Sequence, residues 1–226
     1  MFNKDFCNKL ENSIRKVCKY DKSISLHEPI FLNDEKKKLI SCIDSTFVST
    51  SGNYIQLFEK ELSKICGSKY ILATNTGTAA LHIAYIVSEI SSGDEVLIPS
   101  LNYVASSNVA KYVGAIPHFV EAEEKNLGID TKKLESYLQK ILFRKGKFFY
   151  NKKTSRKISA IVPTHLYGNM SAILELKKIA KKYNLDLIED AAEAIGTYVN
   201  KKHAGTFGRM GILSFNGNKT ITTGSG

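Results

Sequence analysis

One lysine near the end of the sequence has neighbours that suit covalent chemistry. Lys219 ends the run SFNGNK at residues 214–219, and a short stretch of threonine and glycine follows at residues 222–224. A lysine in such a turn, directly after an apolar strand, can be held in a partly dry site where its amine loses a proton and attacks an aldehyde. Because most lysines are solvated surface residues, this run taken alone favours the surface interpretation.

A second run has the features of a phosphate-binding turn. In NTGTAALH, at residues 75–82, an apolar segment ends, Gly77 follows, and a helix begins with small residues. The free N–H groups and the positive dipole end of such a helix favour an anion at the end of the preceding strand. Strand–glycine–helix turns are common in parallel α/β sheets, so this run alone favours a purely structural interpretation.

A third run places two carboxylates at the end of an apolar segment. In IEDAAE, at residues 188–193, Glu189 and Asp190 follow the segment and small residues come next. Acids at the carboxyl end of a parallel strand often serve a ligand. Capping of a following helix by Asp190 explains the same pattern equally well, so this run alone leaves both interpretations open.

Together the three runs match the needs of one cofactor. Pyridoxal 5′-phosphate (PLP) carries a phosphate, a pyridine nitrogen and an aldehyde. It therefore requires an anion seat, an acid that keeps the nitrogen protonated, and a lysine that reacts with the aldehyde. All three requirements are met at expected strand ends of one alternating chain, and we predict a PLP site built from these runs.

Alternating strand and helix patterns around these runs predict an α/β fold with a largely parallel sheet covered on both faces. Residues 1–25 are expected to form a polar, amphipathic lead-in, and residues 26–226 one cofactor-binding domain. The basic stretch 144–157 is expected to be a surface excursion. The predicted strands are 70–73, 95–98, 116–120, 158–163, 185–188 and 212–215, with a small hairpin at 197–203, and the predicted helices are 34–44, 54–66, 78–90, 104–112, 134–142 and 172–183.

The composition argues against several other classes of protein. The 226 residues carry a formal net charge of +10, but the basic residues are dispersed and no basic–aromatic motif accompanies them, which argues against nucleic-acid binding. The four cysteines have the spacing of neither a disulfide scaffold nor a zinc site, so no metal is expected. Without a secretory leader or a run of about 20 apolar residues, we expect a cytoplasmic protein with no membrane segment.

The runs occur in the order and spacing of a known family. The chain resembles the nucleotide-sugar aminotransferases of the DegT/StrS group, which have the type I fold of PLP-dependent transferases. This resemblance implies a large domain with a mostly parallel, seven-stranded sheet covered by helices. It extends from about residue 24 to the last residue and depends on FVSTSG (47–52), GTAALH (77–82), PSLNYVA (99–105), HLYG (165–168), EDAAE (189–193) and SFNGNK (214–219).

The resemblance implies a role for the lysine and for two acids. Lys219 would bond to the cofactor aldehyde and then carry a proton between C4′ of the cofactor and the sugar carbon. Asp190 would pair with the pyridinium nitrogen and keep the ring an electron sink. Glu193 occupies the position of a residue that contacts the phenolic oxygen of the cofactor. A branch of the family that removes a hydroxyl has histidine in place of Lys219, so this chain resembles the transaminases.

The resemblance further implies how the rest of the cofactor would be held. The backbone amides of Thr78 and Ala79, with the hydroxyl of Ser214, would bind the phosphate. Tyr103 occupies the position of the aromatic residue that stacks on the cofactor ring. The resemblance also implies a homodimer.

Within the family the likeness is greatest to enzymes that make 4-amino-4,6-dideoxy-N-acetylhexosamines on UDP. The implied reaction transfers an amino group, normally from glutamate, to C4 of a UDP-linked 4-keto-6-deoxy sugar for surface glycan or nonulosonic acid synthesis. The runs that carry this likeness are LHEP (26–29), DSTFVS (44–49), NKKT (151–154) and SFNGNK (214–219).

Members of the family usually continue well beyond residue 226 into a small C-terminal domain that helps to close the site. On the resemblance, we expect that small domain to be absent here. Two hypotheses follow. The chain is an aminotransferase that functions as part of a longer protein, or it is a catalytically inactive remnant that binds PLP without turnover.

Overall fold

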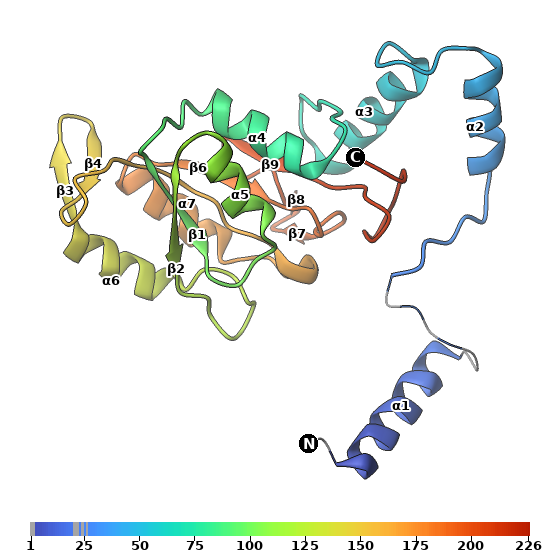
Figure 1. Cartoon of the computed structure of the whole chain (residues 1–226), viewed down its shortest axis with the longest axis horizontal. Helices are drawn as coiled ribbons and strands as arrows, with labels where there is room; N and C mark the ends of the chain where they lie inside the picture. Colours follow the sequence, from blue (N-terminus) through green and yellow to red (C-terminus); the bar gives the residue numbers. More distant parts are fainter. Residues whose placement is uncertain (1–2, 20–22, 24, 26) are drawn as a thin grey trace.

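A five-stranded parallel sheet forms the centre of the structure, a computed structural model that describes residues 3–19, 23, 25 and 27–226 (Figure 1). Every pair of neighbouring strands in this sheet is parallel, as the alternating sequence predicts. In their order across the sheet the strands are β2 (Ile116–Val120), β1 (Glu95–Pro99), β5 (Ile158–Ile161), β6 (Asp186–Asp190) and β9 (Met210–Ile212).

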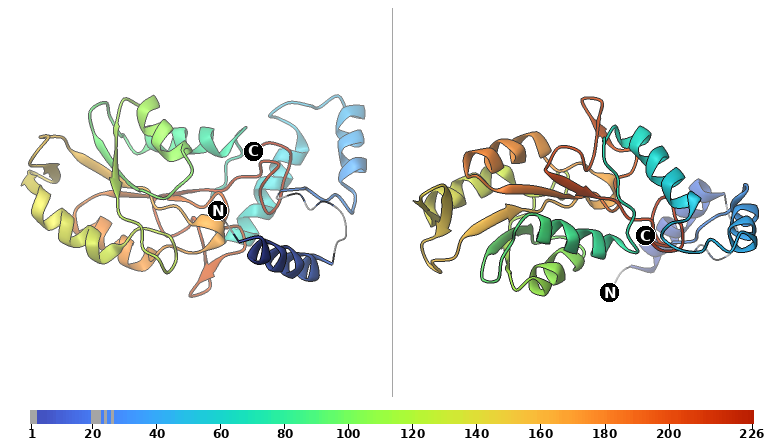
Figure 2. Two further views of the ribbon diagram at one scale, coloured as in Figure 1. Left: turned by 60° about the horizontal axis from the view of Figure 1, so that its bottom comes forward. Right: turned by 90° about the horizontal axis from the view of Figure 1, so that it is seen from above.

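Helices cover both faces of this sheet (Figure 2). Alternate side chains of β1 divide between two apolar cores, with Val96 and Ile98 in one and Leu97 in the other. Such a division follows from the two-residue period of a strand, and it explains why the strands are continuously apolar. The helices on the first face are α4 (Gly77–Val87) and α5 (Ala105–Tyr112), and those on the second face are α6 (Thr131–Ile141) and α7 (Ile173–Lys182).

Three helices precede α4 in the described chain. The first lies within the predicted lead-in and is amphipathic, but none of its side chains is buried. The predicted domain boundary between residues 25 and 26 cannot be placed on an element, because residues 24 and 26 lie outside the described residues. Residue 26 is Leu26 of the LHEP run. The three helices are α1 (Lys4–Cys18), α2 (Glu35–Asp44) and α3 (Asn53–Cys66).

Helices of the described ranges are all too short or too polar to cross a membrane. The remaining elements are short. They are the hairpin strands β3 (Leu142–Lys145) and β4 (Phe148–Asn151), the 3-10 turn η1 (Leu166–Gly168), and the hairpin strands β7 (Tyr198–Val199) and β8 (Lys202–His203).

Most predicted elements are confirmed, with ends that differ by a few residues, but the strand expected at residues 70–73 is not formed. The N–H of Ala73 donates to Glu59 Oε1 at 2.8 Å, so this backbone group is paired with a side chain of α3 and not with a neighbouring strand. Tyr70 and Leu72 are 78% and 73% exposed. The main sheet of the described residues has five strands, fewer than the seven that the resemblance implies.

The basic stretch 144–157 is also more than the surface excursion that was expected. Much of it forms the β3–β4 hairpin, and Asn151 at the end of β4 is buried. The carboxylate of Glu95, at the start of β1, accepts hydrogen bonds from Asn151 Nδ2 at 2.9 Å and from Thr154 Oγ1 at 2.5 Å. His118 Nδ1 of β2 lies 2.7 Å from the same carboxylate. One buried acid thus ties the hairpin to two strands of the sheet.

We expect Glu95→Gln to lower the free energy of unfolding by about 2 kcal/mol, because three partners lose a charged acceptor. Burial opposes ionisation of Glu95, but Asn151, Thr154 and His118 together lower its pKa. A lowered carboxyl pKa stabilises the folded protein above the pKa of the unfolded state, about 4.3, and this contribution is lost as pH falls through the folded pKa.

Urea unfolding at several pH values measures this prediction. The difference between wild type and Glu95→Gln should be full at pH 7 and should shrink below about pH 4. The matched control is Glu121→Gln, which breaks an exposed ion pair with Lys133 and should change stability by less than about 0.5 kcal/mol. Equal effects of the two variants would contradict the role of Glu95.

Candidate functional site

The amino end of α4 meets the segment that follows β9. A Cβ built on Gly77, the first residue of α4, would lie 3.1 Å from Ser214 Cβ and 3.3 Å from Ser214 Oγ. The lack of a side chain at position 77 therefore lets the helix end approach the serine closely. Two of the three predicted runs, 75–82 and 214–219, are in this way brought together at one edge of the sheet.

The first turn of α4 already has one internal cap. Thr76 Oγ1 accepts a hydrogen bond from the Ala79 N–H at 3.0 Å, so this predicted phosphate donor is paired with its own helix cap. The Thr78 amide is a further donor of the same turn. Ser214 Oγ lies 3.2 Å from the carbonyl oxygen of Gly226, to which it donates.

Asp190 is the buried acid of the site, 3% exposed at the carboxyl end of β6. Its Oδ2 accepts a hydrogen bond from Ser106 Oγ at 3.0 Å, and its Oδ1 accepts a long one from the Ala192 N–H at 3.3 Å. Burial raises the pKa of Asp190, while these two donors and the charge of Lys219 oppose that rise. The helix-capping alternative is wrong, because β6 is followed by a turn.

Lys219 faces Glu193. Its Nζ lies 3.1 Å from Glu193 Oε1, while Glu193 Oε2 accepts a hydrogen bond from the Tyr167 N–H at 2.9 Å. Burial works against ionisation of Glu193, but the Tyr167 amide, Lys219 and His27 lower its pKa overall. Tyr167 has a left-handed backbone with φ of 54°, which is unusual for a residue other than glycine. In this conformation the Tyr167 N–H points at the Glu193 carboxylate.

A cavity of about 700 Å³ opens beside Lys219. His27, Glu28 and Phe31 of the N-terminal segment line it, together with Tyr167 and Glu193. Sequence reasoning assigned no site role to His27 or Tyr167, although both lie in runs that carried the resemblance, LHEP and HLYG.

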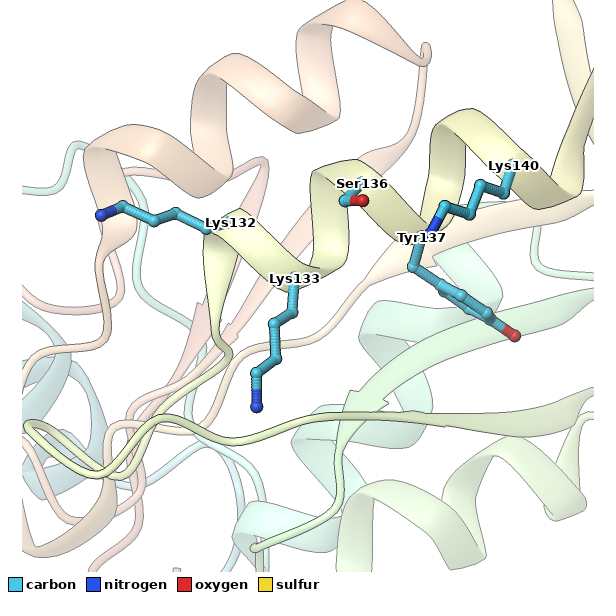
Figure 3. Close-up of a pocket in the computed structure, with 5 residues that line it drawn as sticks. All are labelled: Lys132, Lys133, Ser136, Tyr137 and Lys140. Atoms are coloured by element: carbon cyan, nitrogen blue, oxygen red, sulfur yellow. The ribbon is translucent and has the colours of Figure 1, made fainter.

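A second cavity, of about 410 Å³, lies on α6 and is lined by lysines (Figure 3). Its lining comes from Lys132, Lys133, Ser136, Tyr137 and Lys140, all on one helix. None of the predicted site residues lines it, and Lys133 is paired with Glu121. We therefore place the candidate site at Lys219.

Tyr103 is the predicted residue that the structure leaves apart. It lies between β1 and α5 with its side chain 69% exposed, and it does not line the cavity beside Lys219. Its stacking on a cofactor ring stays a prediction.

Two buried residues behind the site were not predicted. Glu189, next to Asp190 on β6, accepts hydrogen bonds from the backbone N–H groups of Gly205, Phe207 and Gly208 at 2.6–2.9 Å. His165 Nε2 lies 3.1 Å from Glu189 Oε2, and both side chains are fully buried. Because successive side chains of a strand point to opposite faces, Glu189 holds the loop before β9 while Asp190 faces the site.

These residues fit the chemical groups of PLP. A helix amino end with an adjacent hydroxyl suits the phosphate, and the close approach at Gly77 is a cradle that a Cβ would fill. Among the described residues Asp190 has two donors, and its carboxylate retains capacity to accept a further proton donor such as a pyridinium N–H. Lys219 lies near enough to influence the Asp190 carboxylate.

Comparison with known proteins agrees with this fit. A model of the DegT/DnrJ/EryC1/StrS aminotransferase family matches residues 30–226. A GDP-perosamine synthase of Escherichia coli O157:H7 is 38% identical over 205 residues, covering 91% of this chain and 52% of that protein. The putative pyridoxal phosphate-dependent aminotransferase EpsN of Bacillus subtilis is 33% identical over 205 residues, covering 91% of this chain and 50% of that protein.

A solved structure is also similar. Helicobacter pylori PseC, an aminotransferase involved in the biosynthesis of pseudoaminic acid, superposes with a TM-score of 0.75 at 26% identity, over 90% of this chain and 51% of that one. The predicted fold type is thereby confirmed. The chain spans about half the length of the curated relatives it matches.

Proposed function

The chain belongs to the DegT/DnrJ/EryC1/StrS aminotransferase family, and we propose that it forms the PLP site of a nucleotide-sugar aminotransferase acting in the cytoplasm as a homodimer. PLP is the cofactor of this family. The observation that carries the proposal is a buried carboxylate, Asp190, at the carboxyl end of β6, with the lysine of the Lys219–Glu193 pair near enough for its charge to act on that carboxylate.

When bound, PLP supplies an electron sink for the bonds that change at the amino-bearing carbon. The Asp190 carboxylate holds the proton on the ring nitrogen, which keeps the ring electron-poor. Ser214 and the first turn of α4, including the Ala79 N–H that now donates to Thr76, would bind the phosphate.

Lys219 would hold the cofactor through its aldehyde and would carry the proton between C4′ and the substrate carbon. The Glu193 contact orients the Lys219 amine. The Tyr167 N–H donates to Glu193 Oε2 and so fixes the rotation of the carboxylate, which leaves Oε1 directed at the Lys219 amine.

We propose that the acceptor is a UDP-linked 4-keto-6-deoxy-N-acetylhexosamine, aminated at C4, and that glutamate is the donor. The runs LHEP, DSTFVS and NKKT support UDP sugars by resemblance, and the family relationship to PseC is consistent with an amino sugar of this kind. Because GDP-perosamine synthases are among the relatives, a GDP-linked keto sugar is the main alternative acceptor.

Mass spectrometry of the reaction tests this assignment. Purified protein given PLP, glutamate and the UDP-linked keto sugar should yield a UDP-linked amino sugar and 2-oxoglutarate in equal amounts. The GDP-linked keto sugar serves as the comparison, and a preference for it of about 10-fold or more in kcat/KM would reject the UDP assignment. Light scattering of the same sample should give the mass of a dimer.

A further inference from the structure

Ser106 of α5 contacts the site from just outside the run PSLNYVA (99–105). Its side chain is fully buried, and its Oγ donates to Asp190 Oδ2 at 3.0 Å across 84 residues of sequence. The backbone carbonyl of Ser106 accepts in turn from the Tyr85 hydroxyl of α4 at 3.2 Å. Two helices of one face thus hold this hydroxyl against the acid.

Few groups help Asp190 to stay ionised. The Ala192 amide is its other donor, on the opposite carboxylate oxygen, and the remaining charged or titratable groups facing it are His165, Lys219 and Tyr85. His165 Nδ1 accepts the Ser171 N–H at 3.2 Å, which leaves its other nitrogen protonated toward Glu189 and the ring neutral. Lys219 is engaged by Glu193. Of the two hydrogen bonds that the described residues donate to the Asp190 carboxylate, the one from Ser106 is the shorter.

We propose that Ser106 is a positioning residue, which holds the Asp190 carboxylate ionised and turned so that its free lone pairs meet the ring nitrogen of PLP. This inference depends on the proposed function, because it assumes that Asp190 serves that nitrogen. A hydrogen bond to the charged form of an acid favours that form, and a serine hydroxyl on one oxygen also fixes the rotation of the carboxylate.

The test measures the dissociation constant of PLP as a function of pH, by the absorbance of the bound cofactor. We expect Ser106→Ala to weaken PLP binding about 10-fold near pH 7, the loss of one charge-assisted hydrogen bond. The acid limb of the binding profile should also move to higher pH, because Asp190 without its donor takes up a proton more readily.

Three further variants keep the test specific. Ser107→Ala removes a neighbouring hydroxyl that is only partly buried, and it should leave both the affinity and the profile unchanged. Ser106→Thr keeps the hydroxyl and should restore most of the affinity and the wild-type acid limb. In an Asp190→Asn background, Ser106→Ala should produce no further shift of the profile.

A Ser106→Ala profile that matches the wild type would overturn the inference, and so would the same loss of affinity in Ser106→Thr. If instead the wild-type protein takes no label on Lys219 after PLP binding and borohydride reduction, the proposed function fails together with this inference. The two failures are therefore distinguishable.

Discussion

Replacing Lys219 with alanine is expected to abolish covalent binding of PLP and to lower the transamination rate by at least about 1,000-fold. The Lys219 amine is held 3.1 Å from Glu193 Oε1 and lines the cavity of about 700 Å³. Alanine leaves no group there to bond to the cofactor aldehyde or to carry the proton at C4′. The measurement is borohydride reduction of the PLP-treated protein followed by mapping of the modified peptide by mass spectrometry.

The matched control is Lys201→Ala, which removes an exposed lysine between β7 and β8. This variant should keep the label on Lys219 at the wild-type level. A label that survives in Lys219→Ala at full yield, or that resides on another lysine in the wild type, would contradict the assignment of Lys219.

The site residues that could be predicted are those whose evidence is local. Asp190 ends an apolar strand, Gly77 opens a helix after an apolar segment, and Lys219 lies in the turn-rich segment that follows β9, so the sequence itself places them at one edge of the sheet. In a parallel sheet the carboxyl ends of all strands share one edge. Local patterns were therefore enough to expect that these runs would meet.

Contacts that depend on docking of distant elements could not be predicted. The sequence around Ser106 does not show its partner, and its bond to Asp190 exists because α5 packs on the face that Asp190 points to. The residue pattern alone named Glu189 and Asp190 together, and only the resemblance to the family singled out Asp190. Which of them faces the site depends on the register Asp190↔Ile212 of β6 with β9, and no local pattern fixes that register.

The failed strand at residues 70–73 has a similar cause. Its apolar residues satisfy the local pattern of a strand, but strand formation requires partners for the backbone groups. Glu59, 14 residues earlier on α3, takes the Ala73 N–H. A pattern of apolar residues does not show which side chain will bind a backbone amide, so the sequence predicted one strand too many here.

Exchange of the two adjacent acids of β6 for their amides is the second large effect that we expect, and the two variants should differ in kind. Asp190→Asn should lower the transamination rate by roughly 100-fold or more, because an amide does not hold a proton on the ring nitrogen as a carboxylate does. The affinity for PLP should fall with it. Steady-state kinetics and the absorbance of the bound cofactor measure both quantities.

The stability of Asp190→Asn should respond in the opposite direction. Burial raises the pKa of Asp190, so the folded state retains its proton at pH values where the unfolded chain has released it. Stability from this group therefore falls as pH rises through the window above the unfolded pKa of about 3.9. Asparagine carries no charge, so Asp190→Asn avoids this decrease in the free energy of unfolding. Urea unfolding without cofactor at pH 7 should show a variant at least as stable as the wild type.

Glu189→Gln is the matched partner of this experiment, one position away on the same strand. Glu189 accepts from three backbone amides and from His165, and it is fully buried. A glutamine at this position turns an N–H₂ group toward at least one of these donors, which should lower the free energy of unfolding by about 2–4 kcal/mol. Its folded fraction should still bind PLP, because Glu189 points away from the site. If Asp190→Asn proved to be the unstable variant, and Glu189→Gln the one that loses PLP, the roles of the two acids would be reversed. Structural and chemical duties divided between neighbouring carboxylates are thus separable by two conservative substitutions.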